Sequence, residues 1–262
     1  DAFLHYHDLG PRVKTLLKYT RLIKEGKIKN FSLEKFNFEK EIDKQGSIDD
    51  VLSPNKTLII QIIKEPISTK GPRVSSELSF AGRFVVLVPF SNRVSVSQKI
   101  KSKEERIRLK TLIEEFKPKG FGVIVRTVAQ GKKIAELKKD LQNLNKQWVN
   151  LCKKIKGAKT PSRILSELNR SSSILRDLFD DKFTGVYSNN KNLCYEVKDY
   201  IEQIAPKRKS IVKYYKIKNV TLYVKKCPWA SETEIKNYAV EKLKKTTEII
   251  SFLKDKNFKN SD

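Results

Sequence analysis

The chain has 262 residues, enough for roughly two domains. Hydrophobic residues make up 39% of it, which excludes a wholly disordered chain, and no apolar run reaches the ~20 residues that a membrane span requires. The formal net charge of +25 favours a polyanionic partner, nucleic acid before an anionic membrane, although a lysine-rich codon bias is the alternative explanation.

The first part of the chain predicts a small β module. Residues 1–25 hold a loop and a basic helical run, and the polar, mixed-charge segment 26–50 is expected to be a surface insertion. "KTLIIQIIKEP" (56–66) predicts a strand, "ISTKGPR" (67–73) a loop and "VSSELSF" (74–80) the returning strand. Strand, basic loop and strand in this order are typical of the hairpins of a small barrel.

Strands and helices then alternate. Residues 82–90 predict a strand, and Ser102 with Glu105 forms the capping-box pattern of a helix over residues 103–116. The expected apolar face of this helix comprises Ile107, Leu109, Leu112, Ile113 and Phe116. "FGVIVRTVAQGKK" (121–133) opens with another buried strand.

A long helix is predicted from about Lys132 to Gly157. Its apolar residues recur every three or four positions, at Ile134, Leu137, Leu141, Leu144, Trp148, Leu151 and Ile155. Further predicted elements are a helix between 164 and 179, strands at "TGVYS", "IVKYYKI" and "VTLYV", a helix over 191–204, and a last helix capped by Ser231 and Glu234. The order of elements predicts an α+β fold with an N-terminal β module.

Residue types alone indicate no catalytic or metal site. Adjacent acids do not converge, because neighbours point about 100° apart on a helix and to opposite faces on a strand. These pairs are Asp49–Asp50, Glu104–Glu105, Glu114–Glu115 and Asp180–Asp181. His5 and His7 could share a strand face, but no third ligand accompanies them. Three widely spaced cysteines without a CxxC pair suit a reducing cytoplasm, so a cytoplasmic location is expected.

Aromatic and basic residues around the predicted hairpin favour nucleic-acid binding. Phe3 and Tyr6 lie near the start of the chain, and Lys64, Lys70 and Arg73 surround the hairpin loop. An aromatic platform beside a basic loop is how OB-type barrels hold single strands, by stacking and phosphate contact. The alternative is that these are core aromatics and incidental lysines.

Arg126 and Thr127 directly follow the apolar run Val123–Val125. The planar guanidinium can take two phosphate oxygens at once, and threonine adds a short donor beside it. A position at the end of a strand would hold both on a rigid base. The pair therefore favours an anion site; an arginine paired with a local acid is the alternative.

In order and spacing, "ISTKGPR", "ELSFAGRFVVLVPF" and "FGVIVRTVAQGKK" resemble the ribonuclease E/G family of bacterial endoribonucleases, and "DAFLHYHDLGP" resembles the middle of its S1 domain. The resemblance runs from residue 1 to about residue 215. It implies an S1 domain, which is an OB-fold barrel, followed by a 5′-sensor region, an RNase H-like subdomain and a DNase I-like catalytic subdomain. It also implies magnesium-dependent cleavage of single-stranded, AU-rich RNA that carries a 5′ monophosphate, in RNA turnover and rRNA processing.

The resemblance divides the chain into four parts. Residues 1–80 are expected to form a partial S1 domain with an insertion near 26–50, and residues 81–160 the 5′-sensor region, an α/β part with the long helix. Residues 161–216 are expected to be a partial RNase H-like subdomain, and residues 217–262 a divergent tail.

The same resemblance assigns site residues. It implies that Arg126 and Thr127 hold the 5′ monophosphate, and that Gly82 and Val86 line the pocket through backbone and an apolar wall. With the residue pattern above, the RNA contacts expected in the S1 part are Phe3, Lys64 and Lys70.

The family's two magnesium-binding Asp residues and its paired-Cys zinc link lie beyond the point where the resemblance stops. No catalytic or metal residue is therefore assigned: Mg²⁺ is expected in the full-length family enzyme, and none in this fragment. The chain is expected to bind single-stranded RNA with a 5′ monophosphate without cutting it, and the full-length protein could form a homo-oligomer. The alternative is a non-catalytic S1-type RNA-binding module.

Overall fold

The computed structural model describes residues 2–54, 56–166, 170–179 and 183–215. The chain divides into two compact units between residues 166 and 167. Both units contain helices and strands, which confirms the predicted α+β class. The strands of the described residues form three separate sheets and no closed barrel. Among the helices of the described residues, none combines the length and the hydropathy that a membrane span requires.

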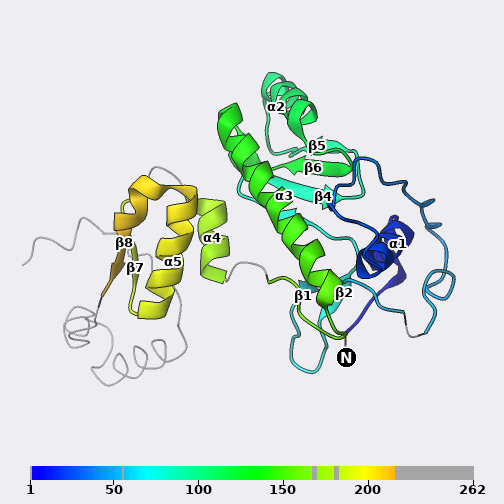
Figure 1. Cartoon of the computed structure of the whole chain (residues 1–262). Helices are drawn as coiled ribbons and strands as arrows, with labels where there is room; N and C mark the ends of the chain where they lie inside the picture. The colour runs from blue at the N-terminus through cyan, green and yellow to red at the C-terminus, as the bar shows by residue number, and fades with distance from the viewer. Residues whose placement is uncertain (1, 55, 167–169, 180–182, 216–262) are drawn as a thin grey trace, which may run out of the picture. The chain divides into compact units, whose positions relative to one another are not determined.

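A four-stranded mixed sheet is the centre of the first unit (Figure 1). Its strands lie in the order β3 (Phe80–Ala81), β4 (Val85–Pro89), β6 (Phe121–Val125) and β5 (Val94–Val96). β4 pairs antiparallel with β3 and β6, whereas β5 and β6 are parallel. Parallel neighbours require a crossover, and α2 (Lys103–Phe116) provides it between β5 and β6.

The predicted strand over residues 82–90 begins three residues later than expected. Gly82 donates its N–H to the carbonyl of Val85 at 2.8 Å, so Arg83 and Phe84 form the two-residue loop of a hairpin between β3 and β4. Within β4, Val85 and Leu87 are buried while Val86 is half-buried, which is the alternation of a strand with one face on the core.

α2 has the predicted bounds and the predicted N-cap. The hydroxyl of Ser102 accepts from the N–H of Glu105 at 3.1 Å. Leu109 and Ile113 are buried, but Ile107 is 66% exposed, so its assignment to the apolar face was wrong. Ile107 stands two positions before Leu109, which places it on another side of the helix.

The long helix, α3 (Ile134–Gly157), runs across the sheet (Figure 1). Six of its predicted apolar positions are buried, namely Leu137, Leu141, Leu144, Trp148, Leu151 and Ile155, whereas Ile134 at its first turn is exposed. These residues share one core with β4, β6 and α1 (Val13–Lys24). The three-and-four spacing therefore reflects packing on the sheet.

Segment 26–50 is not the surface insertion that its polarity suggested. Phe31 and Leu33 are buried in the main core, and Nε1 of Trp148 donates to the carbonyl of Phe31 at 3.0 Å. Phe36 and Phe38 pack against the same core. Apolar side chains at spaced positions among charged ones let this irregular segment cover the core while its lysines and glutamates stay in water.

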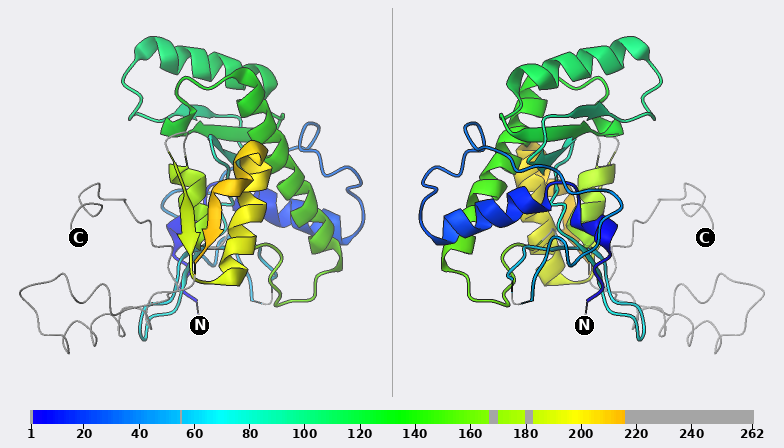
Figure 2. Two further views of the ribbon diagram at one scale, coloured as in Figure 1. Left: turned by 90° about the vertical axis from the view of Figure 1, so that its left-hand side faces the viewer. Right: turned by 90° about the vertical axis from the view of Figure 1, so that its right-hand side faces the viewer.

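β1 (Gln61–Lys64) and β2 (Arg73–Ser75) form the predicted antiparallel hairpin, with strands shorter than expected. The chain start lies along β2: the N–H of Phe3 donates to Pro72 O at 2.9 Å, and that of Val74 to Phe3 O at 3.0 Å. Figure 2 shows the N-terminus beside this hairpin in both views. η1 (Tyr6–Leu9) follows directly.

The second unit is small and has its own core. It contains α4 (Arg170–Leu178), β7 (Val186–Ser188), α5 (Lys191–Ile204), η3 (Pro206–Ile211) and β8 (Val212–Tyr214). β7 and β8 are parallel, and α5 joins them in the chain. The predicted strands "TGVYS" and "IVKYYKI" and the helix over 191–204 are confirmed. The strand "VTLYV" and the helix capped by Ser231 lie outside the described residues.

Candidate nucleic-acid interface

Strand pairing brings Arg126 to the hairpin turn that precedes β4. β6 ends at Val125, which lies opposite Val85, the first residue of β4. The next residue, Arg126, donates its backbone N–H to Phe84 O at 2.8 Å, and its Nη1 donates to Gly82 O at 2.9 Å. The guanidinium is thus oriented by a backbone carbonyl of the turn, at the position where the strand ends.

Thr127 lies at the edge where two parallel strands end. It begins η2 (Thr127–Ala129) and is exposed. β5 runs parallel to β6, so its end meets the end of β6: Ser97 N–H donates to Val125 O at 2.9 Å. The hydroxyls of Ser97 and Thr127 lie 3.2 Å apart. Ligands of open α/β sheets bind at this carboxyl edge of parallel strands.

Val86 extends the same surface along the sheet. It pairs with Ile124, which is 45% exposed, so both side chains lie on the face of the sheet that points away from α3. Arg126 follows Ile124 by two residues and therefore starts on that face. The structure thus brings together Gly82, Val86, Arg126 and Thr127, from two segments that are about forty residues apart in the chain.

Asp140, on α3, holds the turn in place. Its carboxylate accepts backbone N–H groups of three consecutive residues: Arg83 at 3.2 Å, Phe84 at 2.7 Å and Val85 at 3.1 Å. Burial raises the pKa of this carboxyl above its ordinary value, while the three N–H donors and the nearby Arg126 guanidinium act in the opposite direction. The turn is therefore fixed by a charged side chain from a different element.

A second carboxylate holds the loop that follows Thr127. Glu105, on α2, accepts the N–H of Gly131 at 2.8 Å and two N–H groups of Arg108 at 2.6 Å each. The Arg108 guanidinium lowers the pKa of Glu105 to about 2, and the Gly131 N–H contributes to the decrease. Glu105 thus takes part in two contacts. Its backbone N–H donates to the Ser102 hydroxyl at the start of α2, and its carboxylate anchors the loop at Gly131.

The predicted RNA contacts of the N-terminal part also come together. Lys64 pairs with Arg73 across the hairpin, Phe3 lies along β2 on the other side, and Lys70 closes the tip through two hydrogen bonds with Ile67. Phe3 is 60% exposed, and Ile62, Ile63 and Ile67 are exposed as well. An exposed aromatic ring beside two exposed lysines provides a surface for stacking and phosphate contact.

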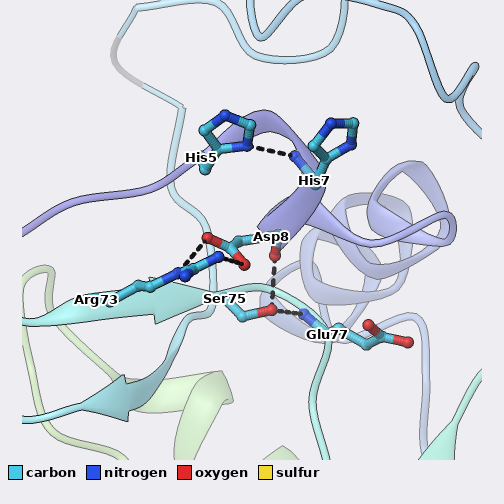
Figure 3. Close-up of polar contacts among 6 residues, drawn as sticks. All are labelled: His5, His7, Asp8, Arg73, Ser75 and Glu77. Atoms are coloured by element: carbon cyan, nitrogen blue, oxygen red, sulfur yellow. Dashed lines mark hydrogen bonds and ion pairs between the residues drawn. The ribbon is translucent and has the colours of Figure 1, made fainter.

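Arg73 is held by an acid (Figure 3). Its Nε and Nη2 donate to the two carboxylate oxygens of Asp8 at 2.9 Å each. The Arg73 hydrogen bond lowers the pKa of Asp8. The pair fixes η1 against β2, so Arg73, which borders the hairpin loop as predicted, also has a structural role.

His5 and His7 stand side by side in the same view, with their ring centroids 5.0 Å apart (Figure 3). Nδ1 of His5 accepts the backbone N–H of His7 at 3.3 Å, which makes this nitrogen a cap of η1. Within the described ranges, no three His, Cys, Asp or Glu side chains gather as metal ligands.

Sequence reasoning missed Ser97, Glu105 as a loop anchor, and Asp140. Asp140 stands between Leu137 and Leu141 of the buried stripe and directly follows two lysines, Lys138 and Lys139. An acid at the margin of an apolar helix face is one signal that could have been noticed, but its partners are backbone groups more than fifty residues away. No pattern in a single sequence identifies such partners.

Comparisons with known proteins show which family the chain resembles. A family model described as Ribonuclease E/G family matches residues 79–250. Ribonuclease E from a Nostoc strain is 33% identical over 156 residues, which cover 60% of this chain and 23% of that protein. Ribonuclease G from Haemophilus influenzae is 30% identical over 206 residues, which cover 78% of this chain and 38% of that protein. A chloroplastic ribonuclease E/G-like protein of Arabidopsis thaliana is 34% identical over 159 residues, which cover 57% of this chain and 16% of that protein.

The chain spans less than half the length of these relatives. The family model nevertheless matches well over half of the chain and includes the β3–β4 turn, Arg126, Thr127 and α3. On this evidence the chain belongs to the ribonuclease E/G family.

Proposed function

We propose that this chain is the RNA-binding, 5′-monophosphate-recognising part of a ribonuclease E/G-type endoribonuclease. The observation that carries the proposal is the contact between Nη1 of Arg126 and the carbonyl oxygen of Gly82, 2.9 Å long, beside the exposed hydroxyl of Thr127. A guanidinium fixed by backbone, next to a short hydroxyl donor, is suited to a terminal phosphate group.

The chemistry of recognition follows from the donors present. Arginine carries five N–H groups in a planar fork, and the bond from Nη1 to Gly82 O helps to orient this fork. A 5′ phosphate would meet this cation and the Thr127 hydroxyl together, with Val86 as the apolar wall beside the first nucleotide. A 5′ hydroxyl offers neither the charge nor the acceptor oxygens, so preference arises as a difference in affinity.

The hairpin surface is the second RNA contact in this proposal. Phe3 would stack on a base, and Lys64 and Lys70 would contact phosphates of the same strand. Because one RNA molecule would engage both surfaces, each contact raises the effective concentration of the RNA for the other. The β1–β2 hairpin with the segment of Phe3 is accordingly proposed as the S1 (OB-fold) part, and the β7–α5–β8 unit as part of the RNase H-like subdomain.

In the whole enzyme, magnesium would supply an activated water for hydrolysis of the RNA phosphodiester. Among the described residues, no three potential carboxylate, imidazole or thiolate ligands come together. In this proposal the chain contributes the binding of RNA, and the whole protein cleaves RNA in turnover and rRNA processing.

Fluorescence anisotropy with three labelled RNAs tests the proposal. The RNAs share one unstructured sequence and carry a 5′ monophosphate, a 5′ hydroxyl or a 5′ triphosphate. We expect the monophosphate to bind about tenfold or more tightly than the hydroxyl, which corresponds to one charge-assisted contact. Equal affinities for all three would overturn 5′-end recognition and favour the alternative, a non-catalytic S1-type RNA-binding module.

A further inference from the structure

The turn between β3 and β4 presents three consecutive N–H groups to a single carboxylate. Both oxygens of Asp140 take part: Oδ1 accepts from Arg83, and Oδ2 accepts from Phe84 and Val85. Consecutive backbone N–H groups that converge on one point form an anion-binding concavity. In this protein the anion is part of the chain itself.

Gly82 makes this arrangement sterically feasible. A Cβ atom at position 82 would lie 2.5 Å from Oδ2 of Asp140 and 2.8 Å from Oδ1, closer than any such contact allows. The backbone of the turn is thus pressed against the carboxylate on one side. On its other side the carbonyl of Gly82 accepts from Nη1 of Arg126. One residue therefore connects Asp140 to the arginine of the phosphate site.

The charges around the turn are consistent with this connection. Asp140 is half-buried on α3, between Leu137 and Leu141, and burial disfavours its charged form. The Arg126 guanidinium is near enough to lower the pKa of this carboxyl, against the increase caused by burial. Arg83, in the turn, also contacts the Asp140 carboxylate, because its backbone N–H donates to Oδ1.

We propose that Asp140 is a positioning residue for recognition of the RNA 5′ phosphate: it holds residues 82–85 in the shape that places the Gly82 carbonyl on the Arg126 guanidinium. This inference rests on the proposed function of the Arg126–Thr127 site. Asp140 does not touch the RNA; it acts through Gly82 and Arg126.

A double-mutant cycle tests the proposal. Asp140→Asn keeps the size of the side chain but replaces one acceptor oxygen by an NH₂ group that faces N–H donors. Binding is measured for Asp140→Asn, Arg126→Ala and the double variant, each with 5′-monophosphate and 5′-hydroxyl RNA of one sequence. We expect Asp140→Asn to weaken monophosphate binding about tenfold and hydroxyl binding less than twofold, and to have little further effect once Arg126 is Ala.

The matched control is Glu136→Gln, which makes the same charge change one turn earlier on α3. Glu136 accepts the N–H of Lys133 at 3.1 Å and has no part in the turn. It should leave the ratio of the two affinities unchanged. Equal losses on both RNAs for Asp140→Asn, or additive effects of the two substitutions, would show a general structural role and overturn the proposal.

A measurement on the unmodified protein covers the case in which Asp140→Asn does not fold. Amide hydrogen exchange of Arg83, Phe84 and Val85 is followed with saturating monophosphate RNA and with saturating hydroxyl RNA. Slower exchange with the monophosphate alone is expected, because a phosphate on Arg126 would tighten the turn. The same exchange rates with both RNAs would overturn the role of Asp140. If the unmodified protein shows no preference for the monophosphate, the proposed function itself fails.

Discussion

Nη1 of Arg126 donates a 2.9 Å hydrogen bond to the carbonyl oxygen of Gly82, which stands 44 positions earlier in the chain. The contact exists because β4 and β6 pair antiparallel, with Val85 opposite Val125. The start of one strand and the end of the other therefore lie together, and each brings one half of the site. A shift of one residue in this register would turn the Arg126 side chain to the other face of the sheet.

Substitution of Arg126 by Ala should weaken binding of 5′-monophosphate RNA by about 1.5–3 kcal/mol, because it removes a charge-assisted contact. Binding of 5′-hydroxyl RNA should change much less. Arg93→Ala is the matched control, since Arg93 is exposed just before β5 and so lies toward the opposite end of the parallel strands. Anisotropy titrations measure both. If the two RNAs lost the same affinity in Arg126→Ala, this residue would be a general backbone contact.

Substitution of Lys70 by Ala should weaken binding of all single strands alike, whatever their 5′ end. Lys70 lies exposed at the tip of the β1–β2 hairpin. A plot of the logarithm of the association constant against the logarithm of the salt concentration has a negative slope. Loss of one phosphate contact should make this slope shallower by about 0.7. Titrations at several salt concentrations give this slope. A change confined to the monophosphate RNA would place Lys70 in the phosphate site instead.

Substitution of Gly82 by Ala should destabilise the protein by about 1–3 kcal/mol, the usual range for overpacking. The added Cβ would overlap the Asp140 carboxylate, with only 2.5 Å to Oδ2. Gly157→Ala is the control: nothing lies within 4 Å of a Cβ there, at the last residue of α3. Denaturant unfolding should show a lower midpoint for Gly82→Ala only. Similar midpoints for both variants would mean that the turn moves away at little cost.

Glu105 should make the free energy of unfolding depend on pH in the acid range. The folded-state pKa of Glu105 is about 2, below its ordinary 4.5, so its stabilisation is complete above about pH 4.5 and is lost as the pH falls toward 2. Glu105→Gln should therefore destabilise the protein by about 1.5–3 kcal/mol at pH 7 and much less near pH 2. Denaturant titrations at several pH values measure the difference.

Glu104→Gln is the control for that experiment, because it neutralises an exposed carboxylate at the neighbouring position of α2. It should leave the free energy of unfolding nearly unchanged at every pH. A difference between the Glu105 variant and the unmodified protein that stayed constant down to pH 2 would contradict the role of the Glu105 charge.

Substitution of Trp148 by Phe should show that segment 26–50 is part of the core. The substitution removes the N–H that bonds to Phe31 O at 3.0 Å and leaves a cavity in an aromatic cluster. We expect the unsatisfied carbonyl to lower the free energy of unfolding by about 1–3 kcal/mol. The cavity should lower it further. Limited proteolysis should cut within this segment sooner in the variant. Unchanged cleavage of the segment would mean that it does not depend on Trp148 for its position.

The sequence by itself determined most of the local structure. The spacing of apolar residues predicted α3 and α5, and the Ser102 pattern predicted the first residue of α2, because these signals depend only on near neighbours along the chain. The motifs of the β3–β4 region and of β6 were enough to suggest the family. The resemblance also named Gly82, Val86 and Thr127, the three residues that the structure gathers around Arg126.

Tertiary structure alone decided how these parts are held. The polar segment 26–50 covers the core because Trp148, more than a hundred positions later, offers a donor and a packing surface for Phe31. Asp140 and Glu105 fix the two loops of the site through backbone N–H groups. A backbone N–H is present at nearly every position, so its partner is set only when the chain has folded and distant elements meet.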